Sequence, residues 1–178
     1  MAEKKKSKKG LIIAMLVFLA ITVYLLKPIL FDSKKSIPKK TDKSITMEPQ
    51  FVKEGTLVFR NTEKDTIRQV EIEIAETDQR RTQGMMYRTS MSYDKAMLFV
   101  MEYERNQSFW MRNTKMSLDI IYINANKEIV TVYKHTQPYS VSPIPSFKKA
   151  KYVVETAAGF CDKFGIEEGN SIEFVRNN

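Results

Sequence analysis

The sequence contains one cysteine, Cys161, and one histidine, His135, among 178 residues. A single thiol cannot form an internal disulfide, and one Cys with one His does not supply the repeated ligands of a zinc site. No serine stands in a G-x-S-x-G motif, and a triad hydrolase built on His would have to use His135. A Cys161–His135 dyad is conceivable, but Cys161 falls on the apolar face of a predicted helix, which favours a structural role. We therefore expect no metal site and no triad hydrolase.

Glycine is also scarce, with six residues in the whole chain. These glycines form neither the G-x-G-x-x-G pattern of dinucleotide-binding folds nor a phosphate-binding P-loop. Nucleotide cofactors are therefore not expected, and the sequence predicts no other cofactor.

Acidic residues are scarce only near the N-terminus. Residues 1–46 contain 11 Lys against three acidic residues, which accounts for the whole formal net charge of +8. Residues 47–178 contain 18 Lys and Arg against 18 Asp and Glu, so this part is neutral. A neutral domain has no net field to attract a phosphate backbone, and we expect no nucleic-acid partner.

The N-terminal quarter has the pattern of a membrane signal anchor. Five lysines precede an uncharged apolar run over residues 11–26, and residues 29–31 extend it. The extended run is long enough to cross a hydrocarbon core of roughly 30 Å. The sequence therefore predicts a basic cytoplasmic tail over residues 1–10, a transmembrane signal anchor over residues 11–31 and a flexible linker over residues 32–46.

The orientation of this anchor is less clearly marked, because both of its flanks are basic and the positive-inside count is nearly a tie. The short basic tail has the form of an export signal, which favours a cytoplasmic N-terminus. We therefore expect a single-pass protein of the cell membrane with residues 47–178 outside the cytoplasm. No small-x-small cleavage site stands out near residues 25–31, so an anchor is favoured over a cleaved signal that would release a secreted domain.

Residues 47–178 have the length of one domain and consist of short apolar or alternating runs separated by turns. Three prolines predict an extended loop over Thr136–Phe147. Two stretches predict helices, Asp78–Arg88 and Ala157–Phe164. The remaining runs predict a strand-rich α+β fold with strands over Phe51–Phe59, Ile67–Ala75, Met97–Met101, Ser108–Met111, Leu118–Ile123, Ile129–Tyr133, Tyr152–Glu155 and Ser171–Val175.

Two carboxylates stand out in these apolar runs. Asp119 lies within Leu118–Ile123, and Glu155 ends an apolar run just before a predicted helix. A buried carboxylate must be paired or hydrogen-bonded. The structural interpretation is an ion pair or a turn brace for Asp119 and a hydrogen bond to nearby backbone for Glu155. The functional interpretation places both in a site.

The order and spacing of several motifs resemble the domain of unknown function 192 family of bacterial and archaeal proteins, over roughly residues 67–175. The motifs are Gly84-Met85-Met86-Tyr87-Arg88, Met97-Leu98-Phe99-Val100, Phe109-Trp110-Met111 with Asn113-Thr114 and Leu118-Asp119, and Tyr152-Val153-Val154-Glu155 with Ala158-Gly159. The resemblance implies a compact single domain with a partly closed β-barrel, often behind an export signal, and no settled activity. Ala96 and Ser117 depart from the family pattern, which usually has Gly and Pro there.

The resemblance also assigns a polar set to this chain, namely Arg88, Asn113, Thr114, Asp119 and Glu155, with Trp110 as the large aromatic residue. Such a set can line a concave pocket for a small polar ligand, with the indole offering a flat face to a sugar ring. The same residues can instead form a buried network that specifies the fold. Both interpretations stay open at this point.

Three functions are compatible with these observations, and the sequence does not decide whether the protein is an enzyme. The first is a membrane-anchored extracytoplasmic domain that binds a saccharide or a cell-envelope fragment around Trp110 and Asp119. The second is a hydrolase in which Asp119 and Glu155 divide the acid and base or nucleophile roles, which requires carboxyl groups about 5–9.5 Å apart. The third is an envelope protein-interaction module with no small ligand.

Methionine is concentrated in one stretch, because seven of the ten fall between residues 85 and 116. Thioethers outside the cytoplasm can bind Cu(I). Methionine is also a routine filler of hydrophobic cores, and these residues lie in segments that are predicted to be buried. Core packing is therefore favoured over copper binding.

Overall fold

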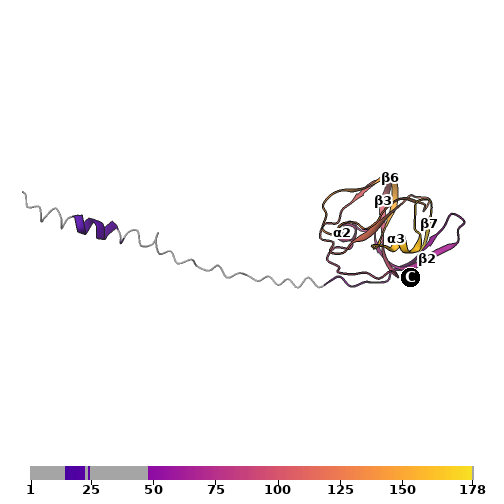
Figure 1. Ribbon diagram of the computed structural model, residues 1–178, viewed down its shortest axis with the longest axis horizontal. Coiled ribbons are helices and arrows are strands. Elements are labelled where there is room, and N and C mark those ends of the chain that lie inside the picture. The colour runs from indigo at the N-terminus through magenta and orange to yellow at the C-terminus, as the bar shows by residue number, and fades with distance from the viewer. Residues whose placement is uncertain (1–14, 23, 25–47, 178) are drawn as a thin grey trace, which may run out of the picture. The chain divides into compact units, whose positions relative to one another are not determined.

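The computed structural model describes residues 15–22, 24 and 48–177 (Figure 1). The chain divides into two units, Met1–Ser44 and Ile45–Asn178, and each is considered by itself. The second unit contains all of the strands considered below.

The predicted transmembrane helix over residues 11–31 is not supported. Within the described part of the first unit, residues 15–22 and 24 are helical. No helix among the described residues is long and apolar enough to cross a membrane. The predicted tail, the linker and the rest of the predicted anchor lie outside the described residues.

The strands of the described domain form one seven-stranded sheet with the spatial order β5-β4-β6-β3-β2-β1-β7 (Figure 1). Two short helices accompany it, α2 (Asp78–Gln83) and α3 (Phe160–Phe164). The strands are β1 (Gly55–Arg60), β2 (Thr66–Ala75), β3 (Lys95–Phe109), β4 (Leu118–Ile123), β5 (Ile129–Tyr133), β6 (Ile144–Ala157) and β7 (Ser171–Arg176).

The pair β2 and β3 is parallel, whereas the other neighbouring strands are antiparallel. Parallel strands cannot be joined by a tight turn, so the chain between them must cross over a face of the sheet. Helix α2 and the segment after it form this crossover. The crossover becomes one wall of the site described below.

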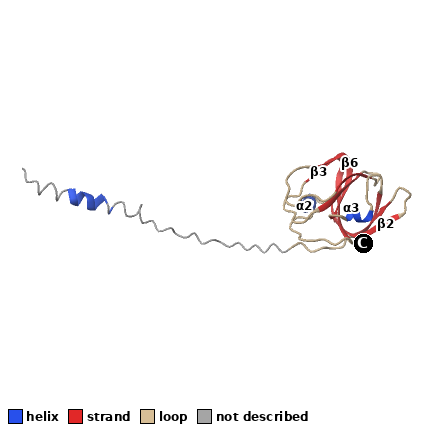
Figure 2. Cartoon of the chain, viewed as in Figure 1, coloured by secondary structure: helices blue, strands red, loops and turns tan. Residues whose placement is uncertain are grey.

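The sheet curls into a half-barrel whose outer strands meet at one end (Figure 2). The backbone N–H of Ile129 donates to the carbonyl of Asn170 at 2.8 Å, and that of Ile172 donates to the carbonyl of Lys127 at 2.9 Å. A bridge between Glu128 and Ser171 lies between these two bonds. The strand-rich single domain with few helices agrees with the sequence, although the transmembrane helix predicted with it does not.

The two faces of the curled sheet pack into separate cores, because successive side chains of a strand point to opposite faces. On β3, Ala96 and Leu98 belong to one core, which also contains Phe160 of α3. Met97 and Phe99 of the same strand belong to the other core, which is closed by side chains from the crossover and the inter-strand loops. The second face therefore carries the site.

Several predicted boundaries are corrected by the structure. The predicted strands Met97–Met101 and Ser108–Met111 are parts of one strand, β3, whose polar middle is exposed and pairs irregularly with β6. The predicted loop Thr136–Phe147 ends early, because β6 begins at Ile144. The predicted helix Asp78–Arg88 ends at Gln83, since the next residue adopts a backbone conformation open only to glycine.

Candidate functional site

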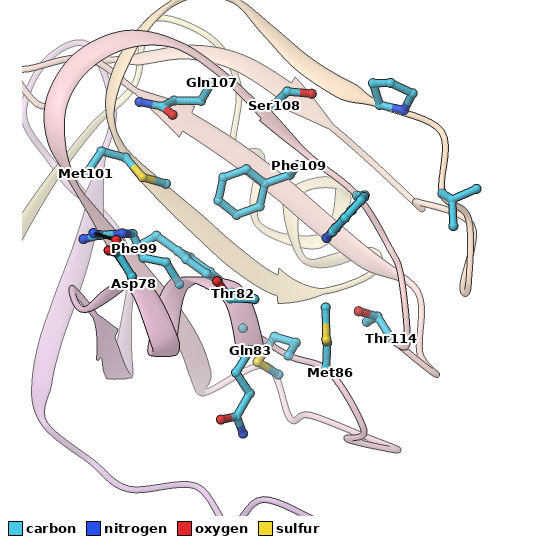
Figure 3. Close-up of a pocket in the computed structure, with 16 residues that line it drawn as sticks. Asp78, Thr82, Gln83, Met86, Phe99, Met101, Gln107, Ser108, Phe109 and Thr114 are labelled. Carbon is cyan, nitrogen blue, oxygen red and sulfur yellow. Dashed lines mark hydrogen bonds and ion pairs between the residues drawn. The ribbon is translucent and has the colours of Figure 1, made fainter.

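A cavity of about 490 Å³ opens between α2, β3 and three loops around residues 84–86, 110–114 and 141–143 (Figure 3). Its volume lies within the range of about 300–1,000 Å³ that is usual for small-molecule sites. Figure 3 shows the ring of Phe109 on one side and the α2 residues Thr82 and Gln83 on the other. The cavity is therefore a candidate binding site formed by segments that are far apart in the sequence.

Aromatic rings form the apolar part of the cavity wall. Phe99 and Phe109 both line it, and their rings meet edge to face with centroids 5.0 Å apart. Phe109 also packs against Tyr122 with a centroid distance of 5.8 Å, which fixes the ring from behind. Trp110 lines the same cavity and keeps 47% of its surface exposed, while the Arg112 guanidinium lies 5.5 Å from its ring centroid. A flat, partly exposed indole is thus available to a ligand.

The polar part of the lining consists mainly of amides and hydroxyls, from Thr82, Gln83, Gln107, Ser108 and Thr114. Two charged residues also line the cavity, Asp78 and Arg81, and they pair with each other at 2.6 Å. The lining therefore carries no net charge. A site of this kind is suited to a neutral ligand with hydrogen-bonding groups.

The loops at the cavity are held in place by backbone hydrogen bonds. The N–H of Tyr87 donates to the carbonyl of Asn113 at 2.9 Å, and the N–H of Tyr139 donates to the carbonyl of Thr114 at 3.1 Å. Tyr87, Asn113 and Tyr139 all have positive φ angles, of 69°, 57° and 61°. Left-handed backbone is costly for side chains such as tyrosine and tends to occur at functional sites. Three such residues on neighbouring loops indicate a preorganised rim.

A buried charge cluster lies on the cavity face of the sheet, behind the crossover. Arg88 follows α2 and is 6% exposed, and its Nη1 lies 2.5 Å from Oε2 of Glu73 on β2, which is 3% exposed. The other carboxylate oxygen of Glu73 accepts the backbone N–H of Val52 at 3.0 Å. The ion pair therefore joins the crossover, the sheet and the segment before β1.

Glu155 lies in the same layer and is 4% exposed. Register places Glu73, Met97 and Glu155 side by side on three adjacent strands, so all three side chains point to one face. Burial raises the pKa of the Glu155 carboxyl from 4.5 to about 8, against the lowering effects of a hydrogen bond from the Met85 backbone and of the Arg88 charge. The carboxyl is therefore mainly neutral at pH 7, and the cluster holds one cation and one anion.

Asp119 faces the opposite side of the sheet from Glu155. In the register of β4 and β6, Asp119 pairs with Thr156, and Glu155 pairs with the next residue along, Ile120. Adjacent positions of a strand point to opposite faces. The carboxylate of Asp119 accepts the backbone N–H groups of His135 and Cys161, each at 2.9 Å. Asp119 is therefore a buried brace between α3 and the segment after β5.

This arrangement overturns the paired-carboxylate hydrolase hypothesis. Two carboxyl groups that flank a scissile bond must face the same space. Asp119 and Glu155 face opposite sides of the sheet, and neither lines the cavity. The structure also gives no support to a Cys161–His135 dyad, since burial and the neighbouring Asp119 raise the pKa of the Cys161 thiol.

The predicted set is thus divided by the structure. Trp110 and Thr114 line the cavity, and Asn113 supports the rim through a hydrogen bond from its amide to the hydroxyl of Tyr87 at 3.2 Å. Arg88 and Glu155 lie in the buried cluster. Asp119 is not part of the site.

The sequence did not indicate several lining residues. Phe99 and Phe109 lie in predicted strands and were not singled out as site residues, but their rings pack in the second core and also line the cavity. Thr82 and Gln83 lie on a helix with no buried residue, so no apolar pattern marked its face toward the cavity. Gln107 lies in the exposed part of β3, where polar residues are unremarkable.

The methionines do not converge on a metal position. Met85, Met86 and Met101 line the cavity, but Figure 3 shows Met86 and Met101 at opposite ends of it. The sulfur of Met111 is buried and accepts the hydroxyl of Thr136 at 3.2 Å. Among the described residues there is likewise no group of three or more His, Cys, Asp or Glu side chains placed to hold a metal ion.

The fold and the cavity define a class of small strand-rich domain, a curled sheet with a ligand-sized hollow under its parallel crossover. The chain belongs to the DUF192 family of uncharacterised proteins, described as Uncharacterized ACR, whose sequence profile matches residues 59–174.

Two curated relatives are archaeal UPF0127 proteins. The chain is 28% identical to one from Thermococcus sibiricus over 103 residues, which are 58% of this chain and 65% of the relative. It is 29% identical to one from Pyrococcus furiosus over 109 residues, which are 60% of this chain and 89% of that relative. The chain thus spans just under two thirds of the first relative.

Two crystal structures are similar in fold. A proposed transcription regulator from Sinorhizobium meliloti 1021 is 29% identical, with a TM-score of 0.66 over 70% of this chain and 98% of that chain. A protein of unknown function from Novosphingobium aromaticivorans is 26% identical, with a TM-score of 0.63 over 66% of this chain and 83% of that chain.

The brace at Asp119 leads to a stability prediction. In Asp119→Asn, one carboxylate oxygen becomes an NH₂ group that cannot accept a backbone N–H, so one buried donor loses its partner. We expect the free energy of unfolding to fall by about 1–3 kcal/mol, measured by urea denaturation. The control is Asp162→Asn, an exposed carboxylate paired with Lys134 and His135, for which we expect a loss below about 1 kcal/mol. Equal losses of unfolding free energy in the two variants would contradict the role of Asp119 as a buried brace.

The buried carboxyl of Glu155 leads to a prediction on pH. Its folded pKa of about 8 lies above the ordinary 4.5, so the folded state holds a proton that the unfolded state loses. The stabilising proton is present at low pH and its contribution is lost as pH rises from about 5 to 8, by up to about 1.4 kcal/mol per pH unit. Glu155→Gln removes this dependence. Unfolding curves should therefore show that the variant becomes more stable relative to the native protein when the pH is raised from 5.5 to 7.5. A difference in unfolding free energy between the two proteins that is the same at both pH values would contradict the raised pKa of Glu155.

Proposed function

We propose that the domain binds a small neutral ligand of saccharide type in the cavity beside Trp110. The observation that carries this proposal is the combination of a partly exposed indole with a neutral lining of amides and hydroxyls in one ligand-sized hollow. A ligand with a charged group would find Asp78 and Arg81 already paired with each other.

Sugars match this lining in two ways. The apolar face of a pyranose ring packs well on a flat aromatic surface, which Trp110 offers. Its hydroxyl groups can exchange hydrogen bonds with both donors and acceptors, which the side chains of Gln83, Gln107 and Thr114 supply. An N-acetylated sugar of the cell envelope adds an amide that the same side chains can recognise.

Binding is favoured over hydrolysis because the cavity has no free carboxylate. The carboxylate that lines it, Asp78, is paired with Arg81. The placement of residues 47–178 outside the cytoplasm stays a prediction, and the proposal does not depend on it. An envelope protein-interaction role also stays a prediction, for which the exposed Tyr139 and Val141 beside the cavity offer an apolar contact.

Trp110 is the single tryptophan of the chain, so its fluorescence reports on the cavity directly. We expect neutral oligosaccharides such as chitotriose, maltotriose or cellotriose to change its emission in a saturable way, with at least one of them doing so below millimolar concentration. Gln107→Ala should weaken binding of that sugar about fivefold by removing a hydrogen bond worth about 1 kcal/mol. Trp110→Ala, followed by calorimetry, should weaken it about tenfold or more.

The matched control is Gln69→Ala, an exposed glutamine on β2 outside the cavity lining. Its affinity for the same sugar should be unchanged. If no neutral sugar changes the emission of the full-length protein, or if Gln69→Ala and Gln107→Ala weaken binding equally, the proposed site is wrong.

A further inference from the structure

One wall of the cavity rests directly on Glu155. Gly84 and Met85 line the cavity, and the Met85 backbone N–H lies near enough to the Glu155 carboxyl to lower its pKa. A β-carbon added to Gly84 would lie 3.1 Å from Cζ of Phe99 and 3.6 Å from Oε2 of Glu155. The chain therefore passes closely over the Phe99 ring, as glycine allows, and the Glu155 carboxyl lies within van der Waals distance of the same wall.

The Oε2 atom of Glu155 is buried and has no hydrogen-bond partner among the described residues. A neutral carboxyl tolerates this position much better than an anion, because an unpaired charge in an apolar layer loses its hydration without compensation. The space around it contains mainly Met97, Phe99 and Met85. The protonated, neutral form of Glu155 is therefore the form that fits the packed layer under the cavity.

The charged and titratable groups near Glu155 are few. Arg88 lies close enough to lower its pKa, but that guanidinium is already paired with Glu73 at 2.5 Å. Glu73 is itself a carboxylate two strands away, across Met97. Tyr122 on β4 is the remaining neighbour, and its phenol is neutral because burial and Glu155 raise its pKa. Arg88 is the one cation among these groups, and its buried Nε has no hydrogen-bond partner among the described residues.

We propose that Glu155 is a positioning residue whose proton holds the Gly84–Met86 wall in its binding arrangement, so that the cavity loses affinity when this carboxyl ionises. An ionised Glu155 would draw the Met85 N–H and the Arg88 guanidinium toward its charge or admit water into the layer, and either change alters the position of the Gly84–Met86 wall. The part of this inference that concerns ligand affinity rests on the proposed function, whereas the movement of the wall does not.

The first test needs no ligand. The emission of Trp110 in the full-length protein is recorded from pH 6 to 9.5. We expect a transition with a midpoint near pH 8, the pKa of Glu155, and its loss in Glu155→Gln, whose amide is neutral at every pH. The control is Glu63→Gln, an exposed carboxylate in the turn between β1 and β2, which should keep the transition. No transition, or one that persists in Glu155→Gln, would overturn the inference.

A second measurement covers the case in which Glu155→Gln does not fold. In the native protein labelled with ¹³C and ¹⁵N, the Glu155 carboxyl carbon and the Met85 amide are followed by NMR over the same pH range. We expect both signals to shift with one common midpoint. A Met85 amide that ignores the titration of Glu155 would overturn the inference whatever the variant does.

The binding test uses chitotriose as the probe. If only the protonated form binds, the apparent dissociation constant rises about tenfold between pH 7 and pH 9 in the native protein, because the competent fraction falls by that factor. Glu155→Gln should remove this rise. Affinity that is independent of pH in the native protein would overturn the inference and leave the proposed function intact. Absence of chitotriose binding at every pH, with the Trp110 transition present, would instead count against the ligand and support the movement of the wall.

Discussion

The buried ion pair between Arg88 and Glu73 is the interaction on which the cavity side of the domain depends. A parallel pair of strands forces a crossover, and this crossover contains a helix of six residues with no buried side chain. Such a helix cannot dock on the sheet through its own apolar surface. Met85, which is buried in the second core, and Arg88 fasten the crossover after the helix, and Glu73 also holds the backbone of Val52. Removing one partner of a buried pair typically costs about 3–5 kcal/mol.

Charge balance in this layer then determines the state of Glu155. One guanidinium lies near two carboxyl groups and pairs with one of them, Glu73. The other carboxyl group, that of Glu155, has no such partner. Burial therefore disfavours its charged form and raises its pKa. The burial of Glu155 in the folded domain therefore places an ionisable group beneath the cavity wall. The polar set is therefore divided, because Trp110 and Thr114 line the cavity whereas Arg88 and Glu155 belong to the scaffold beneath it.

Trp110 and Thr114, two of the residues predicted to bind a ligand, line the same cavity. The face of Asp119 could not be predicted, since all six residues of β4 are buried and no polar alternation distinguishes its two sides. The paired-carboxylate hypothesis failed on this point.

Other differences have equally physical causes. The exposed middle of β3 looked like a loop because a strand that extends away from the core carries polar residues on both faces. An apolar run at the N-terminus predicted a membrane span, and no helix among the described residues is long and apolar enough to form one. The cavity itself depends on how three loops meet, and loop contacts between distant segments leave no periodic signal in a sequence.

The most direct test of the account is an NMR titration of the ¹⁵N-labelled full-length protein with chitotriose. We predict that the largest shift changes occur at the Trp110 indole, the Gly84 amide and the Gln107 side chain, which line one cavity. Signals of His135 and Cys161, which contact Asp119 on the other face, should not change. Changes centred on His135 and Cys161, or none at millimolar sugar, would contradict the assignment of the cavity as the binding site.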